Sequence, residues 1–227
     1  MATNNAAQAA YEFKQLLKNK TPEQEKVIRY FYNQPKGCFG KVMSDAEYDK
    51  MVNDFLAKNN SFKDKAISKI GLDESEISLI APVCIKGYLF DDKKAYAKCG
   101  KDDHLWRSSM FQVSWIFFSE TQVYLYQYTF NFDENGKKES SEEYFYKDVV
   151  NFSSSEETVE KVTWESKKGC LGKQGPLERV TREVENVRLS IVVPGDKMYC
   201  AATVTDDSFE TSIKGMKNLL REKKNNG

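Results

Sequence analysis

No stretch of this chain carries a strong catalytic motif. His104 is the only histidine, and it follows Asp102 and Asp103 in a charged turn. An imidazole titrates near neutral pH, so His104 could act as a general base. A single histidine cannot build a multi-histidine metal site, and it makes a histidine-cysteine triad an unfavoured interpretation. We therefore expect a surface histidine, no catalytic residue, no metal and no cofactor, in a protein that is not an enzyme.

The cysteines are odd in number, far apart in the sequence and without a Cys-x-x-Cys pair. This pattern is typical of free thiols in a reducing compartment rather than of a disulfide framework. The first residues lack the basic start and apolar run of a signal peptide. We therefore expect a cytoplasmic protein whose thiols are Cys38, Cys84, Cys99, Cys170 and Cys200.

A glycine-rich stretch from Gly169 to Gly175 has a superficial similarity to a phosphate-binding loop. It lacks the Gly-Lys-Ser/Thr ending, and the pattern places no helix after it. The sequence favours a flexible connection between two strands over residues 167–176.

Charge provides one weak binding hypothesis. The 34 basic and 34 acidic residues cancel, so no overall field attracts nucleic acid, and we expect none to bind. A local basic cluster could contact anionic lipid head groups, although Asp91, Asp92, Asp102 and Asp103 interrupt it. A solvated turn is the favoured interpretation of the cluster, which consists of Lys93, Lys94, Lys98, Lys101 and Arg107.

The strongest structural signal is an aromatic hairpin over residues 106–132, with a turn at Glu120 and Thr121. Side chains of a strand alternate between two faces. One face of the second strand therefore carries only aromatic residues: Tyr124, Tyr126, Tyr128, Phe130 and Phe132. Such a face could stack nucleic-acid bases, but adjacent Asp133 and Glu134 would repel the phosphates, so we expect the protein core.

Helices are predicted before this hairpin and at the C-terminus. Capping boxes at Thr21 and Ser44 start two of them, and Ser61 and Gly71 bound a third. Asp206 starts the last helix, while Asn135-Gly136 predicts a two-residue hairpin turn. The acidic run 153–160 is interpreted as a connection between strands. Strands are expected over residues 80–90, 95–99, 139–146, 148–154, 159–166, 179–193 and 197–205, besides the aromatic hairpin.

Several strands followed by one amphipathic helix resemble a bacterial pleckstrin-homology-like (PH-like) domain. Three short segments carry the resemblance: Trp115-Ile-Phe-Phe-Ser, Val123-Tyr-Leu-Tyr and Glu143-Tyr-Phe-Tyr-Lys-Asp-Val-Val. In the last segment, Tyr146, Asp148 and Val149 match the family's Tyr-x-Asp-Ile/Val element. It implies an α+β chain: a helical N-terminal segment, 1–77, then a PH-like antiparallel β-barrel or sandwich domain, 78–227, capped by the C-terminal helix. A lipocalin-like closed barrel ranks second.

The resemblance also implies a function. Such domains are usually not enzymes; they bind proteins, peptides or lipid head groups, and bacterial members can self-assemble. We therefore expect a non-catalytic interaction module that binds a protein or peptide partner, through an exposed edge strand or the groove beside the last helix. Phospholipid binding through the basic cluster is the alternative, and homo-oligomers are compatible with both.

Overall fold

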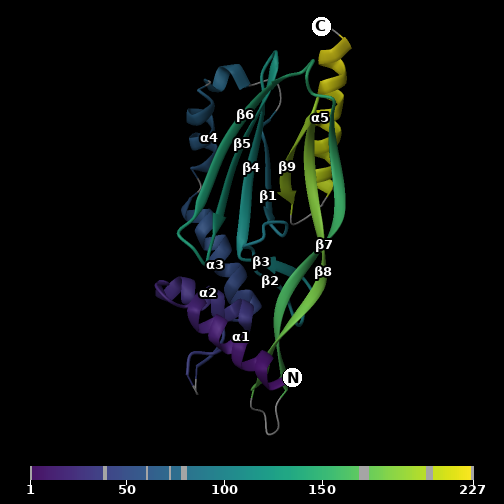
Figure 1. The fold of residues 1–227 in the computed structure, drawn as a ribbon. Helices are drawn as coiled ribbons and strands as arrows, with labels where there is room; N and C mark the ends of the chain where they lie inside the picture. Colours follow the sequence, from purple (N-terminus) through teal and green to yellow (C-terminus); the bar gives the residue numbers. More distant parts are fainter. Residues whose placement is uncertain are drawn as a thin grey trace.

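The computed structural model describes residues 2–37, 40–59, 61–71, 73–77, 81–168, 174–202 and 207–225. Within these residues the chain is α+β, with helices at both ends and antiparallel sheets between them (Figure 1). This confirms the predicted fold class at that level. No helix in the described part of the chain is long and apolar enough to cross a membrane.

Three of the N-terminal helices begin where the sequence predicts, after Thr21, Ser44 and Ser61. Thr21 and Gln24 form a capping box, and so do Ser44 and Glu47. In each box, the side chain of the first residue accepts a hydrogen bond from the backbone N–H of the second, and the side chain of the second accepts one from the backbone N–H of the first. Gly71, at φ +79°, ends the fourth helix in the left-handed conformation that glycine tolerates. The elements are α1 (Ala2–Leu16), α2 (Pro22–Tyr32), α3 (Asp45–Lys58), α4 (Phe62–Ile70) and the short 3-10 helix η1 (Glu74–Ile77).

The first sheet has the strand order β1-β4-β5-β6, and all its neighbours are antiparallel. The predicted aromatic hairpin is its centre, and Trp115 lies opposite Tyr126 across the two strands. A two-stranded ladder, β2 (Ala97–Cys99) with β3 (Trp106–Ser108), lies beside it. The strands of the first sheet are β1 (Val83–Tyr88), β4 (Met110–Phe118), β5 (Gln122–Asn131) and β6 (Lys137–Phe145).

The turn predicted at Asn135-Gly136 is wrong in detail. Strand pairing ends at Phe130 and Lys137, and the Asn131 amide donates to the Gly136 carbonyl at 3.3 Å. The Asp133 amide donates to the Asn131 side chain at 2.9 Å, which shapes a longer loop. Neither Asn135 nor Gly136 has the positive φ that a two-residue turn of this type needs.

The second sheet has the order β7-β8-β9 and is followed by the C-terminal helix. Its first strand corrects the interpretation of residues 153–160 as a connection. Those residues pair with β8 without a break, and Glu156, Glu157 and Glu160 are all exposed, so their charges reach solvent while the backbone stays hydrogen-bonded. The elements are β7 (Asn151–Lys168), β8 (Gln174–Val193), β9 (Asp196–Ala202) and α5 (Asp207–Asn225).

The aromatic face of the first sheet packs against the N-terminal helices (Figure 1). Tyr126 is fully buried and Tyr124 is 5% exposed, which confirms that this face is core. The ring of Phe55 lies 4.4 Å from that of Phe130, and Phe62 lies 5.0 Å from Tyr128. We call this the helix-side core; its buried aromatic members from the helices are Tyr30, Phe31, Tyr32, Tyr48 and Phe62.

The opposite face of the first sheet packs against the second sheet and α5. We call this the sheet-side core; it contains Ile85, Ile116, Leu125, Phe152, Leu189, Ile191, Ile213, Met216 and Leu220. The last helix therefore covers the face opposite the aromatic side chains. The described strands form open sheets rather than one closed barrel, so the lipocalin-like alternative gains no support.

Strand β9 crosses the first sheet at close range. Gln112 accepts a hydrogen bond from the Ala201 amide at 2.8 Å, and Gln127 donates to the Tyr199 carbonyl at 2.7 Å. These two side chains satisfy backbone groups on the edge of β9 that faces away from β8. A Cβ atom added to Gly87 would lie 2.5 Å from the Ala201 backbone, so the approach requires glycine there.

We therefore predict that Gly87→Ala lowers the free energy of unfolding by about 1–3 kcal/mol, because two backbones must move apart. Gly136→Ala is the matched control, since an added Cβ meets nothing within 4 Å and φ is not positive. Urea unfolding monitored by circular dichroism measures both variants. Equal stability of the two variants would contradict this packing.

Candidate functional site

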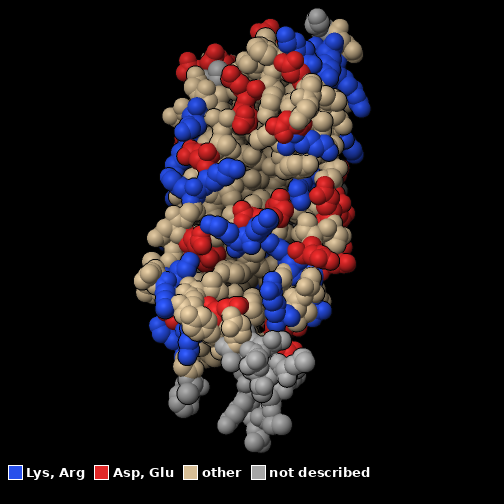
Figure 2. Space-filling view, in the orientation of Figure 1, with Lys and Arg blue, Asp and Glu red and all other residues tan. Residues whose placement is uncertain are grey.

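The five residues of the predicted basic cluster do not share one exposed surface. Lys93, Lys94 and Lys101 are exposed, whereas Lys98 is half-buried and Arg107 is 3% exposed. Lys94 lies 3.7 Å from Glu134, which offsets part of its charge. Figure 2 shows basic and acidic side chains interspersed over the face in view, without a large area of one sign.

Arg107 is bound inside the protein. Its guanidinium donates to both carboxylate oxygens of Asp49 on α3, at 2.7 and 2.6 Å, and to Asp103 at 2.6 Å. Lys98 lies 3.4 Å from the Asp45 carboxylate and 3.7 Å from the centre of the Tyr30 ring. These two basic side chains therefore connect the β2–β3 ladder to α2 and α3.

His104 lies in the exposed turn where the sequence places it, with the positive φ of +56°. Gly100 donates to the Leu105 carbonyl at 2.9 Å and closes this turn. Hydrogen bonds from Arg107 lower the pKa of neighbouring Asp103 to about 2, so Asp103 stays ionised and committed to that ion pair. No catalytic pair is assembled around His104 by these contacts.

The cysteines show no sign of activation in the described residues. Burial raises the pKa of Cys84 to about 11 and that of Cys200 to about 12, so both stay protonated thiols at neutral pH. Cys99 is also a free thiol. Cys38, Cys170 and residues 169–173 of the glycine-rich stretch lie outside the described residues. Within the described ranges, no group of three or more His, Cys, Asp or Glu could hold a metal ion.

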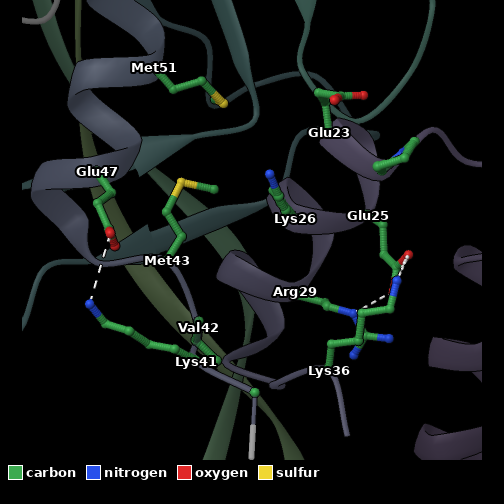
Figure 3. Close-up of a pocket in the computed structure, with 12 residues that line it drawn as sticks. Glu23, Glu25, Lys26, Arg29, Lys36, Lys41, Val42, Met43, Glu47 and Met51 are labelled. Carbon is green, nitrogen blue, oxygen red and sulfur yellow. Dashed lines mark hydrogen bonds and ion pairs between the residues drawn. The ribbon is translucent and has the colours of Figure 1, made fainter.

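A groove of about 640 Å³ lies between α2 and α3 (Figure 3). Three elements position its lining: α2, the loop that leads from it, and the first two turns of α3. Its apolar side chains are Val42, Met43 and Met51, and Met43 and Met51 also pack against the helix-side core. The remaining lining residues are Pro22, Glu23, Glu25, Lys26, Arg29, Lys36, Gly40, Lys41 and Glu47.

Ion pairs fix much of the rim of this groove. Glu25 accepts from Arg29 at 2.8 Å and from Lys36 at 3.2 Å, while Lys41 lies 3.8 Å from Glu47 (Figure 3). The hydrogen bond from Arg29 is the main cause that lowers the pKa of Glu25, so this carboxylate is ionised at neutral pH. The rim therefore carries both signs of charge around an apolar floor, an arrangement that suits binding rather than proton transfer.

A second hollow, of about 530 Å³, lies between α1, residues 90–96 and the long β7–β8 hairpin. Lys93 of the basic cluster lines it, with Tyr96 and Trp164. Lys161, 9% exposed, also lines it; burial lowers the pKa of this amine, which donates to the Asp92 carbonyl at 2.7 Å. The amine of Lys161 is thus engaged by a backbone carbonyl. Of the two hollows, this one has the more polar lining.

Sequence reasoning missed both hollows. The α2–α3 groove depends on Val42 and Met43, two apolar residues in a loop without helical or strand periodicity. The only local signal is that they precede the Ser44 capping box, and such residues commonly pack against the helix that follows. Which helix lies opposite them is a tertiary fact, so the groove itself has no sequence signature.

No protein-family model matches this chain. No curated protein and no solved structure matches it either.

The buried position of Arg107 generates a stability prediction. Asp49→Asn removes the charge that faces the guanidinium in a bidentate pair, so we expect the free energy of unfolding to fall by about 2 kcal/mol. Asp54→Asn on the same helix is the control, because its pair with Lys50 is exposed and worth at most about 1 kcal/mol. Chemical unfolding measures both; a loss for Asp49→Asn no larger than the control's would contradict a structural role for Arg107.

Proposed function

We propose that this protein is a non-catalytic interaction module that binds a short segment of a protein partner in the α2–α3 groove. The observation that carries the proposal is the apolar floor of Val42, Met43 and Met51 inside a charged rim. Methionine side chains adapt to different apolar partners and are frequent at peptide-binding surfaces. A groove between two helices is also a common place for an amphipathic peptide to dock.

The rim favours a peptide over a purely apolar ligand. Basic and acidic groups both surround the floor, so a peptide with one apolar anchor and charged flanks can satisfy them together. Glu23 and Lys26 form no ion pair with any other described residue, which leaves one charge of each sign for a partner. Both charges lie on α2, and the anchor would enter between them and α3.

This site differs from the groove beside the last helix that the sequence suggested. The apolar side of α5 is occupied, because Ile213, Met216 and Leu220 are all at most 5% exposed in the sheet-side core. The α2–α3 groove retains half-buried apolar side chains that a ligand can still cover.

We also propose a PH-like relationship for the part of the chain from β1 to α5. Two antiparallel sheets followed by one amphipathic helix that packs on them are compatible with it. On this proposal, the N-terminal helices are an addition that covers the outer face of the first sheet. Anionic lipid binding stays the alternative function. It would depend on Lys93, Lys94 and Lys101, the three lysines of the basic cluster whose side chains are exposed.

Selection of a random peptide library on the whole chain tests the proposal. We expect enriched peptides to share an apolar anchor beside charged residues, and Val42→Glu to weaken their binding about tenfold or more, because it places a charge on the apolar floor. Lys26→Glu tests the rim by reversing one of its charges. Fluorescence polarisation of a labelled enriched peptide gives the affinities.

Val150→Glu is the matched control, since Val150 is 55% exposed in the turn before β7, outside the groove. Enriched peptides that bind Val42→Glu and Lys26→Glu as tightly as the parent protein would overturn the proposed site. Flotation with phosphatidylserine vesicles separates the alternative: retention on vesicles that is lost on Lys93→Glu/Lys94→Glu would favour lipid binding instead.

A further inference from the structure

Strand β6 is an edge strand with one unused side. It pairs with β5 from Phe130↔Lys137 to Gln122↔Phe145, and no other described strand pairs with it (Figure 1). Lys137, Lys138, Glu139, Ser141, Glu142 and Glu143 are exposed. An open edge presents backbone donors and acceptors to any strand that can approach it.

The backbone groups on the open side belong to the odd-numbered residues. In an antiparallel ladder, the hydrogen-bonding groups of successive residues point alternately to one neighbour and away from it. At the two ends of the β5–β6 pairing, Tyr146 donates to Thr121 and Asn131 donates to Gly136, so the even positions bond to β5. Lys137, Glu139, Ser141 and Glu143 consequently direct their N–H and C=O groups outward.

The charges along β6 are divided between its ends. Lys137 and Lys138 begin the strand, and Glu142 and Glu143 lie near its end, with Glu139, Ser140 and Ser141 between them. An antiparallel copy of the same strand would reverse this order. The basic end of one copy would then face the acidic end of the other.

We propose that β6 is a self-association edge, which pairs antiparallel with β6 of a second copy of this chain about a two-fold axis at Ser140. Lys137 then faces Glu143 of the second copy, and Lys138 faces Glu142. The two-fold axis repeats each of these two pairs, which gives four lysine–glutamate pairs across the junction. Opposite charges directly across an antiparallel pair stabilise it.

Hydrogen-bond direction leaves few competing registers. Outward residues must face outward residues, so the axis can move only by whole residues along the strand. An axis at Ser141 places Glu139 opposite Glu143, and an axis at Glu139 removes every lysine–glutamate pair and places Glu139 opposite itself. The register at Ser140 alone combines an outward ladder with four complementary pairs, because both lysines and both glutamates lie three or two residues from it.

The geometry of the side chains is compatible with this junction. A two-fold axis perpendicular to the sheet keeps each face of β6 continuous with the same face of its copy. Glu139 already accepts from the Tyr126 hydroxyl at 2.9 Å, and it would face Ser141 rather than a charge. The result is one continuous eight-stranded antiparallel sheet, with β6 in its centre instead of at its edge, built from two four-stranded sheets.

A charge-swap experiment tests the proposal. The parent chain should sediment as a dimer of the 26.1 kDa polypeptide at high micromolar concentration, and the dimer should weaken as salt screens the ion pairs. Lys137→Glu/Lys138→Glu and Glu142→Lys/Glu143→Lys should each self-associate about tenfold more weakly or not at all. An equimolar mixture of the two variants should dimerise again, because every cross-strand pair becomes complementary once more.

Two further variants keep the result unambiguous. Lys214→Glu/Lys224→Glu changes the net charge equally at exposed positions of α5, and it should leave the dimer intact. Ser141→Pro removes one outward N–H without changing charge, and it should weaken the dimer while an edge strand tolerates the proline. A monomeric parent chain, or a dimer that both charge-reversal variants retain, would overturn the proposal. Peptide binding in the α2–α3 groove should persist in the monomeric variants.

Discussion

Burial of both faces of one central sheet is the constraint on which the rest of this structure depends. Strands β4 and β5 carry aromatic side chains on one face and mainly aliphatic ones on the other, with Gln112, Ser114, Gln127 and Thr129 where β9 crosses. Neither face can remain in water, since each large side chain left exposed costs roughly 1.5–3 kcal/mol. The N-terminal helices cover the aromatic face, and the second sheet with α5 covers the other.

Where the helices and the second sheet meet the first sheet, polar groups become buried and need hydrogen-bond or charge partners. A few side chains supply these partners. Gln112 and Gln127 satisfy backbone groups of β9 where the second sheet crosses the first, and Gly87 provides the space. On the helical side, Arg107 and Lys98 are neutralised by Asp49, Asp103 and Asp45. Basic residues that look like a lipid site in the sequence are, for these two positions, the connection between the β2–β3 ladder and the helices. Among the described residues, the α2–α3 groove and the open edge of β6 are the two surfaces that we propose for partners.

Much of this arrangement could be predicted from the sequence, because the signals are local. Capping boxes at Thr21 and Ser44, the alternation in β4 and β5, and the amphipathic last helix each specify their own element. The errors arose where local pattern and tertiary context disagree. Asn135-Gly136 lies in a loop shaped by the Asn131 side chain, and the acidic run 153–160 forms a strand because β8 supplies its partner. Which cover lies on which face, and hence where the groove forms, depends on contacts between residues far apart in the chain.

The central claim is that the helices and the strands stabilise one another through the aromatic face, and one measurement tests it most directly. Residues 78–227 produced without the helical segment should fail to unfold cooperatively and should bind a hydrophobic dye, because Tyr124, Tyr126 and Phe130 lose the side chains that bury them. Addition of residues 1–77 as a separate chain should restore a cooperative transition in calorimetry. A 78–227 fragment that unfolds cooperatively at the temperature of the whole protein would contradict the account.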